Sequence, residues 1–321
     1  MQAQTQQAKK QAKKGCKQFW VAVILVAVGI IGFYRANAAS PDSMQTTFAT
    51  PAAAGQALLA AAQSQDEKAL EKILGPDSQA IFKPGDATED EAALKSFVVK
   101  FDEMNRWVKL TDGSEILNIG ADNYAFPIPL VQDKSLNWHF DTKAGQDEIL
   151  TRQIGRNELL AIDAVSAIAN AEELYAQRPH DGNPAGLYTT KIFSSAGKQD
   201  GLYWPVADGE PSSPLGRVEI FAKDALSTPN ESPIIDGYSF RILTAQAGQA
   251  KGGAKSYIVN GEMTGGFAVI ASPVKYGDSG IMTFIVNRDG VVYQQDLGPD
   301  TDVVSASITQ YNPATDWEPV E

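Results

Sequence analysis

The stretch RNELLAIDAVSAIANAEELYAQ, residues 156–177, decides the fold of the second half of the chain. Its larger apolar residues recur every three or four positions, which is typical of an amphipathic helix. Most of the remaining positions are alanine, a strong helix former that also permits close packing. The pattern predicts a long helix within 143–177 whose apolar face packs on a sheet. Six residues are expected near that face: Leu159, Ile162, Val165, Ile168, Glu172 and Tyr175.

The residues that follow this helix predict the sheet. The segment 178–236 is rich in Gly, Pro, Ser and Asp, and it indicates few regular elements. Asp289-Gly290 lies between two apolar runs and predicts a tight hairpin turn. A short helix is expected at 302–310. Five runs are expected to form antiparallel strands: 238–244, 255–260, 265–273, 280–287 and 290–296.

The region 50–142 predicts a separate α+β arrangement of helices and a small antiparallel sheet. Thr50 precedes Pro51 as a helix cap precedes a first-turn proline, and the alanine-rich run continues to Ala62. Ser64 and Glu67 have the spacing of a capping box, which predicts the start of a second helix. The fold class is therefore α+β throughout. Four runs are expected to form strands: 106–111, 114–119, 124–131 and 135–141.

The first 38 residues have the pattern of an export leader. Five lysines precede the apolar run Phe19–Tyr34, and Ala36-Asn37-Ala38 fits a small-residue cleavage site. We expect 1–38 to be a cleaved export signal, or alternatively an inner-membrane anchor through 19–34, with 39–49 as a linker. Both alternatives place the body outside the cytoplasm, in the periplasm or beyond it, and allow membrane contact only through the N-terminal segment.

Composition excludes several classes of function. The chain has 321 residues and a net charge of −12. Its 27 positive residues fall to 21 without the six of the leader, against 39 negative ones, so the body carries −18. This charge argues against nucleic acid as a partner, because phosphate contacts need clustered Lys and Arg. The single cysteine, Cys16, lies in the leader, so no disulfide, thiolate metal cluster or cofactor is predicted for the body.

Several strings in the body resemble a bacterial family known as domain of unknown function 2950. The resemblance extends over nearly the whole body, and it implies no particular reaction or cofactor. The strings are WHFDTKAGQDEILTRQIGRNELLAI at 138–162, GKQDGLYWP at 197–205, SPLG at 213–216, GYSFRILTAQ at 237–246 and GGFAVIASPVKYGDSGIMTFIVNRDGVVYQQDLGPDT at 265–301.

The element order from 156 to 298 also resembles the periplasmic part of type IV pilin-like proteins. In those proteins an alanine-rich helix packs on an antiparallel sheet. The apolar leader here lacks the Gly-Phe-Thr-Leu-Ile-Glu type of processing segment, which leads directly into the long helix of true pilins. The resemblance therefore implies a pilin-like region at 143–321 that has a use other than pilus assembly.

One string suggests nucleophilic catalysis. Gly277-Asp278-Ser279-Gly280 resembles the nucleophile region of chymotrypsin-like proteases. Such a serine needs a histidine base oriented by a carboxylate, and the chain offers His139 and His180. Neither histidine has the surrounding sequence of that family. We therefore favour the alternative, a glycine-rich turn between two strands.

Two further groups are candidates for binding. Asp181 and Asn183 follow His180 and offer oxygen ligands for a cation, although a helix-terminating loop is the favoured interpretation. Asp200, Tyr203 and Trp204 offer an aromatic platform for a glycan or a peptide. The alternative is that these aromatic residues anchor an irregular loop to the core, as long ordered loops require.

These observations favour a non-catalytic exported envelope protein that acts as an interaction or assembly module, with an envelope protein or a glycan as its partner. An enzyme is the less favoured class, because the body has few residues of catalytic type. Two alternatives remain open at this point. One is a periplasmic hydrolase acting on peptide or cell-wall material, and the other is a glycan- or peptide-binding module.

Overall fold

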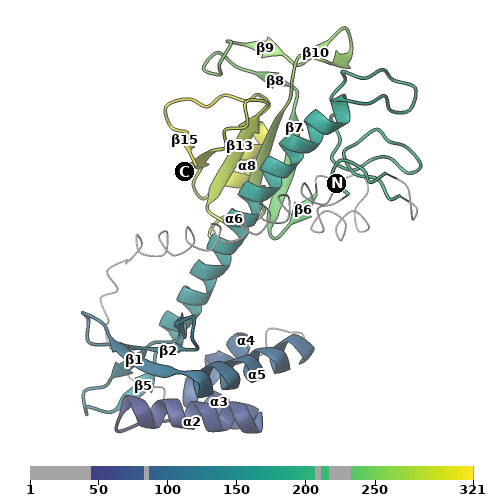
Figure 1. Cartoon of the computed structure of the whole chain (residues 1–321). Coiled ribbons are helices and arrows are strands. Elements are labelled where there is room, and N and C mark those ends of the chain that lie inside the picture. The colour runs from purple at the N-terminus through teal and green to yellow at the C-terminus, as the bar shows by residue number, and fades with distance from the viewer. Residues whose placement is uncertain (1–44, 83–86, 207–210, 217–232, 321) are drawn as a thin grey trace, which may run out of the picture. The chain divides into compact units, whose positions relative to one another are not determined.

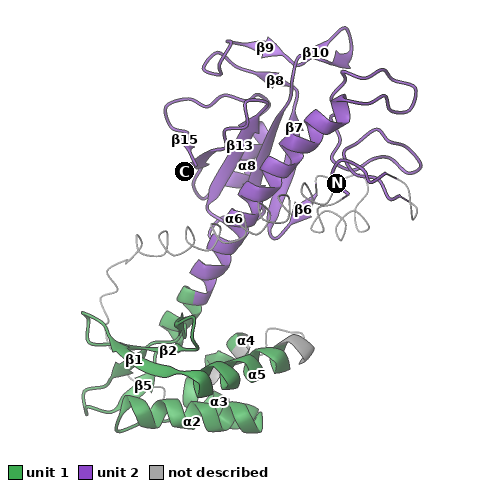
Figure 2. Cartoon of the chain, in the orientation of Figure 1, with its two compact units in different colours: residues 1–148 green, residues 149–321 purple. Residues whose placement is uncertain are grey.

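The computed structural model describes residues 45–82, 87–206, 211–216 and 233–320 (Figure 1). The fold is α+β, and the chain forms two compact units, residues 1–148 and 149–321 (Figure 2). The boundary falls within the longest helix, α6 (Thr142–Ala176). The predicted leader lies outside the described residues. Within the described ranges, no helix has both the length and the apolar composition needed to cross a membrane.

The first unit begins with helices whose starts follow from local capping. The side chain of Thr50 accepts a hydrogen bond from the amide of Ala53, which confirms the predicted cap. The predicted capping box at Ser64 is wrong. Asp66 caps the second helix instead, and the Ser64 hydroxyl donates to Ala60 O because Ser64 still belongs to the last turn of the preceding helix. The helices are α2 (Pro51–Ser64), α3 (Glu67–Leu74), η1 (Pro76–Ser78), α4 (Gln79–Phe82) and α5 (Ala87–Glu103).

An antiparallel sheet accompanies these helices. Phe48 exchanges two backbone hydrogen bonds with Trp138, so part of the segment expected to be a linker pairs with the sheet. The predicted strand 124–131 is instead two short strands, because Pro127 and Pro129 cannot donate to a ladder. The strand order is β1 (Asn105–Lys109), β2 (Glu115–Ile119), β4 (Leu130–Gln132) and β5 (Trp138–Phe140), with β3 (Tyr124–Ala125) beside β2.

In the second unit, α6 packs through a stripe of small and branched residues that includes Ala161, Val165 and Ile168. Leu159 was expected on this face, but it is 54% exposed. The reason is geometric, because each residue turns the helix by about 100°. Nine positions separate Leu159 from Ile168, so the helix rotates by about two and a half turns between them. The remaining half turn places Leu159 on the side opposite the stripe. Apolar residues spaced only three positions apart move gradually around the helix, because a turn has about 3.6 residues, and spacings of four are needed to keep them on one face.

The main sheet of the second unit is antiparallel and has the predicted central strands. Short strands at its two edges were not predicted. The run 255–260 was predicted as one strand, but it contributes one strand to each of two two-stranded ribbons. The ribbons pair β8 (Ala245–Gln246) with β9 (Lys255–Ser256), and β10 (Ile258–Val259) with β11 (Glu262–Met263). The sheet order is β15 (Glu318–Pro319), β14 (Tyr293–Asp296), β13 (Met282–Asn287), β12 (Ala268–Pro273), β7 (Tyr238–Leu243) and β6 (Ile234–Ile235).

Helices cover both faces of this sheet (Figure 1). Tyr238 and Phe240 belong to the core that also contains the buried face of α6. Arg241, which alternates with them, donates from Nη2 to the carbonyls of Ser305 and Ile308, each at 2.9 Å. Successive residues of a strand point to opposite faces, so Arg241 identifies the face covered by α8 (Thr301–Ser307). The sheet is therefore a middle layer between the two helices.

Candidate functional site

Six of the eight candidate residues lie in one segment, residues 177–206, which we call the exit loop because it follows α6. The chain turns there through two residues with positive φ, Asp181 and Gly182. The amide of Gly186 then donates to Ala176 O at 2.7 Å and closes the end of the helix. The six candidates are His180, Asp181, Asn183, Asp200, Tyr203 and Trp204.

His180 is held between two aromatic rings. It stacks on Tyr175 with the ring centroids 4.1 Å apart, and its edge meets Trp204 at 5.5 Å. Nε2 lies 3.0 Å from Tyr175 O, so this nitrogen carries the proton and donates it to the carbonyl. Nδ1 lies 3.4 Å from Oε1 of Gln199. Both ring nitrogens therefore face other parts of the loop, and the imidazole links the end of α6 to the loop.

Asp200 is the centre of a polar cluster. Its carboxylate accepts hydrogen bonds from the ammonium of Lys191 at 2.6 Å and from the amide and hydroxyl of Ser195 at 2.7 and 3.0 Å. Burial raises the pKa of Asp200, but the hydrogen bonds from Lys191 and Ser195 outweigh it and lower the pKa to about 2. Asp200 is therefore ionised at neutral pH and closes the part of the loop between Lys191 and itself.

Asp200→Asn is expected to lower the free energy of unfolding by about 2 kcal/mol at pH 7. A lowered pKa contributes stability above the ordinary value near 3.8, and this contribution is lost as the pH falls toward 2. The deficit of the variant should therefore shrink between pH 5 and pH 2, which urea unfolding at each pH can measure. Asp278→Asn is the matched control, because the Asp278–Lys275 pair is exposed and should change stability by less than about 0.5 kcal/mol. A deficit independent of pH would contradict the assignment.

The two exit-loop aromatic residues are half-buried and contact the core. The amide of Tyr203 donates to Ile192 O at 2.9 Å, and its ring meets Phe193 edge-on at 6.0 Å. Trp204 packs against His180 and the core of the second unit. These contacts are those expected if the aromatic residues anchor the irregular loop to the core. Both residues remain partly accessible.

The two oxygen-ligand candidates also make local contacts. Oδ2 of Asp181 accepts a hydrogen bond from the amide of Gln199 at 2.7 Å, and Asn183 pairs with His180 through the backbone. In the part of the chain that the structure describes, no group of three or more His, Cys, Asp and Glu side chains is arranged to hold a metal ion. The geometry of this turn is that of a helix-terminating loop.

Ser279 and His139 lie outside the exit loop. The Ser279 hydroxyl accepts from the amide of Lys275 at 3.0 Å and donates to the carbonyl of the same residue at 3.1 Å. The hydrogen bonds of His180 go to Gln199 and Tyr175, so this histidine is not the base of Ser279. His139 is buried in β5 of the first unit. Within the second unit, the structure does not bring His180 to Ser279 as a triad requires.

The α6 residues that hold the turn 277–280 were not among the predicted site residues. Oε1 of Glu158 accepts from the amides of Ile281 and Met282 at 2.9 and 3.0 Å. The amide group of the adjacent Asn157 donates to Ser279 O at 2.8 Å. Two consecutive polar side chains of the helix therefore bind the backbone of the turn and of the two residues that follow it. The sequence signal was a polar pair, Asn157-Glu158, beside an apolar face.

Glu172 is the most unusual ionisable group of the second unit. Its side chain is fully buried, and Oε2 accepts from the amide of Thr189 at 3.1 Å. Oε1 makes no hydrogen bond within the described residues. Burial raises its pKa well above the ordinary value, the Thr189 hydrogen bond opposes this shift, and the neighbouring Glu173 adds to it. The protonated form of this carboxyl group is therefore favoured in the folded protein.

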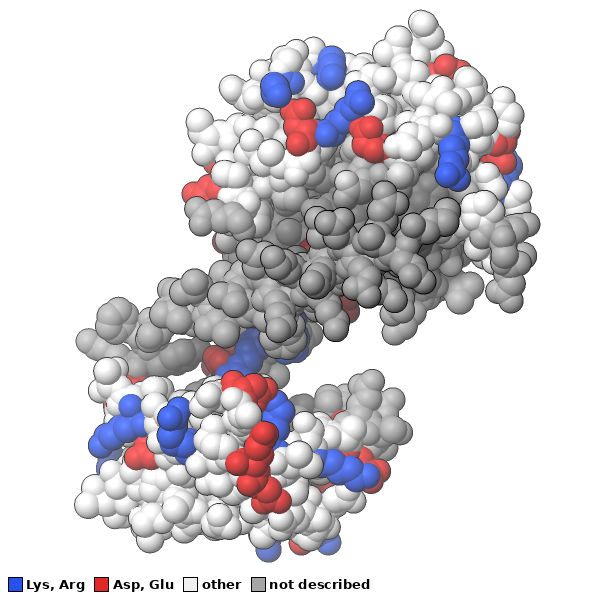
Figure 3. Space-filling model, viewed as in Figure 1, with Lys and Arg blue, Asp and Glu red and all other residues white. Residues whose placement is uncertain are grey.

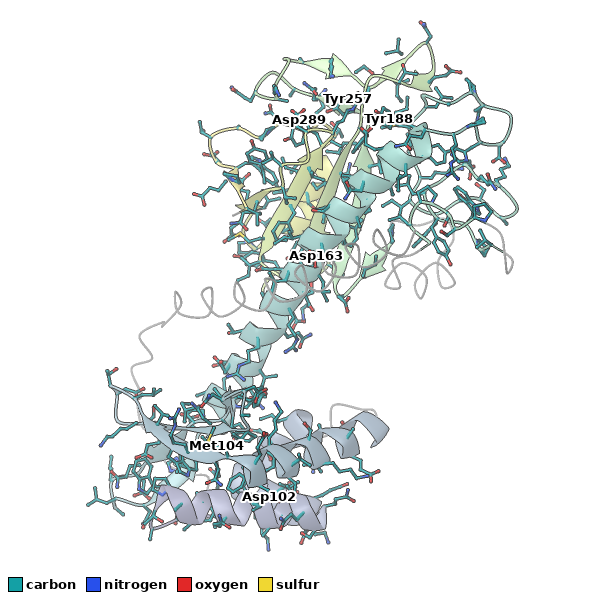
Figure 4. All side chains as sticks on the ribbon, in the orientation of Figure 1. Asp102, Met104, Asp163, Tyr188, Tyr257 and Asp289 are labelled. Atoms are coloured by element: carbon teal, nitrogen blue, oxygen red, sulfur yellow. The ribbon has the colours of Figure 1, made fainter. Side chains whose placement is uncertain are left out.

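A small charged cluster lies next to Glu172. Glu173 pairs with Arg288 at 2.8 Å and accepts from the Tyr188 hydroxyl at 3.2 Å. Arg288 also lies over the Tyr188 ring, 5.9 Å from its centroid. Tyr188 is found beside the C-terminal end of α6 (Figure 4). This cluster connects the end of α6 to the turn after β13.

Residues 45–320 match the family described as protein of unknown function (DUF2950). The chain belongs to the DUF2950 family. This confirms the family that the sequence resembles. No curated protein and no solved structure gives a significant match to the chain.

The DUF2950 match includes both units and every candidate residue. In this DUF2950 chain the ionisable and hydroxyl side chains singled out above mostly bind backbone groups of loops. Glu158, Glu172 and Asp181 each accept a hydrogen bond from a main-chain amide, and Ser279 bonds both main-chain groups of Lys275. Such an arrangement orders loops around α6.

Proposed function

We propose that this protein is a non-catalytic interaction module that acts outside the cytoplasm. The observation that supports it best is that hydroxyl and carboxylate side chains of the type used in catalysis bind the backbone of loops. Ser279 bonds the backbone of Lys275, Glu158 bonds the backbone after that turn, and Asp200 closes the exit loop. These contacts hold two loops rigid before a partner binds. A rigid loop loses little conformational entropy on binding, which favours a recognition surface.

The leader and the charge support an extracytoplasmic location. Residues 1–38 combine a basic start, an apolar run and a small-residue site, and a body with 39 acidic residues carries a net negative charge. On the face shown in Figure 3, Lys and Arg side chains are interspersed with Asp and Glu over each unit. This distribution suits an envelope protein as the partner better than a strongly charged polymer.

The arrangement of the second unit supports a pilin-like module. A single long helix, α6, packs on one face of an antiparallel sheet, and an ordered loop of about 30 residues follows the helix. The leader contains no acidic residue, so the usual processing and polymerisation of pilins is not proposed. We propose that the exit loop provides the contact surface, because its half-buried aromatic residues combine accessible area with fixed positions.

A photo-crosslinking residue placed at Val206 of the full-length protein, in cells, tests this proposal. Val206 is exposed at the end of the exit loop, and Val303 on α8 is an exposed control. We expect one discrete protein adduct from position 206, none from 303, and the same adduct after Ser279→Ala. Loss of the adduct in Ser279→Ala, or equal labelling from both positions, would favour the hydrolase alternative or a different surface.

A further inference from the structure

A surface depression of about 320 Å³ lies on the α8 face of the second unit, away from the exit loop residues. Its volume is at the lower end of the range of about 300–1,000 Å³ that is usual for small-molecule sites. It therefore suits a small ligand, or one ring of a larger ligand that continues into solvent. Eight residues line it: Ala247, Ile285, Ser307, Ile308, Thr309, Gln310, Asn312 and Trp317.

The backbone that carries most of these residues is fixed at both ends. The carbonyl of Ile308 accepts a hydrogen bond from the half-buried Arg241 at 2.9 Å. Three residues later, the amide of Tyr311 donates to Ala245 O at 3.0 Å, and Tyr311 O accepts from the amide of Ala247 at 2.9 Å. The segment 308–312 is therefore held in place without a ligand, which lowers the entropy cost of binding one.

The lining combines an aromatic wall with neutral polar groups. Trp317 is half-buried, and Ile285 of β13 contributes apolar surface. The side chains of Thr309 and Gln310 are exposed and make no hydrogen bond with any residue in the described ranges. Asn312 accepts from the amide of Gln249 through Oδ1 at 3.1 Å, which leaves its Nδ2 donors for a ligand. Hydroxyl and amide groups are thus available beside an indole ring.

The lining contains no Lys, Arg, Asp or Glu, although about a fifth of the chain is charged. An anionic or cationic ligand would lack a counter-charge here. An extended peptide would be bound mainly by main-chain hydrogen bonds at a sheet edge, whereas this depression offers side-chain amides and hydroxyls. A neutral sugar ring has an apolar C–H face that packs on an indole and hydroxyl groups that bond amides.

We propose that this depression binds an uncharged sugar unit of a glycan. Trp317 packs against the C–H face of the ring, and Gln310, Asn312 and Thr309 exchange hydrogen bonds with its hydroxyls. The site is separate from the exit loop, so it does not depend on the function proposed above. That function concerns a protein partner and survives if this site proves empty.

Calorimetric titration of the purified full-length protein with three neutral tetrasaccharides, made of glucose in α-1,4 linkage, glucose in β-1,4 linkage and N-acetylglucosamine, tests the proposal. At least one should bind, and Trp317→Ala should weaken it by tenfold or more. Gln310→Ala removes an exposed side chain with no internal hydrogen bond, so it should fold normally and weaken binding by about three- to tenfold. Gln153→Ala, an exposed position on α6, is the matched control and should leave binding unchanged.

Three results would overturn the assignment. The first is no measurable binding of any of the three tetrasaccharides. The second is binding that Gln310→Ala leaves unchanged, which places the glycan elsewhere even if Trp317→Ala fails to fold. The third is equal or tighter binding of tetra-alanine or of an acidic tetrasaccharide of galacturonic acid, which would assign the depression to a peptide or a charged polymer.

Discussion

Gly280→Ala is expected to lower the free energy of unfolding by about 4 kcal/mol. A Cβ atom at this position would lie 2.5 Å from Cζ and 2.6 Å from Cε2 of Tyr238, and closer still to its hydroxyl. Tyr238 is fully buried, so its ring cannot move aside without opening the core. Displacing it also breaks the hydrogen bond from its hydroxyl to Met282 O at 2.9 Å.

Chemical denaturation of the two proteins at pH 7 measures this difference. Gly248→Ala is the matched control, because nothing lies within 4 Å of the added Cβ and its φ is outside the left-handed region. That variant should differ from the parent by no more than about 0.5 kcal/mol. If Gly280→Ala were as stable as Gly248→Ala, the close approach of the turn to Tyr238 would be wrong.

This contact bears on the string that resembles a protease nucleophile. In a protease the glycine two residues before the serine serves the oxyanion. In this chain the glycine after the serine, Gly280, leaves space for a buried tyrosine ring. Its neighbour Ser279 is turned back on Lys275, and Asn157 binds its carbonyl. Ser279 and Gly280 are thus explained by turn formation and packing, which agrees with the turn interpretation made from the sequence.

Elements with strong local signals were predictable. Alternating or continuous apolar residues indicated β12 and β13, and alanine with branched residues indicated α6, because these patterns reflect burial along one face. Two kinds of detail were not predictable: the side of a long helix on which a distant residue lies, and the choice between two neighbouring residues that could cap a helix. Leu159 lies on the exposed side of α6, because the helix rotates by about half a turn more than two full turns between it and Ile168. Asp66 caps α3, although Ser64 had the spacing of a capping box with Glu67.

The candidate sites were predictable only where the relevant residues are neighbours in the chain. His180, Asp200 and Trp204 were identified because they lie in one irregular segment with turn-forming residues. The depression beside Trp317 was not, since Ala247, Ile285 and Trp317 come from distant parts of the chain and meet only in the folded protein. Glu172 was placed on the correct face, but the sequence did not indicate how completely it is buried.

Glu172→Gln is expected to change how stability depends on pH. The folded protein holds the Glu172 proton at pH values where the unfolded chain has released it, because burial raises the folded pKa. Folding then takes up a proton, so this group lowers stability as the pH rises from the ordinary glutamate value toward the folded one. Glutamine cannot ionise, and the variant should gain about 3 kcal/mol relative to the parent between pH 4 and pH 8, the order of the penalty for a buried ion.

Urea unfolding of both proteins at pH 4, 6 and 8 gives this difference directly. At pH 4 the two should be of similar stability, since the glutamine oxygen can accept the Thr189 amide as Oε2 does. Glu173→Gln is the matched control, because Glu173 is partly exposed and pairs with Arg288, so its variant should change stability by less than about 1 kcal/mol. A constant difference between Glu172→Gln and the parent across this range would mean that Glu172 is ionised in the folded protein. Its buried Oε1 would then need a cationic or hydrogen-bonding partner, and α6 would have to pack differently around Thr189.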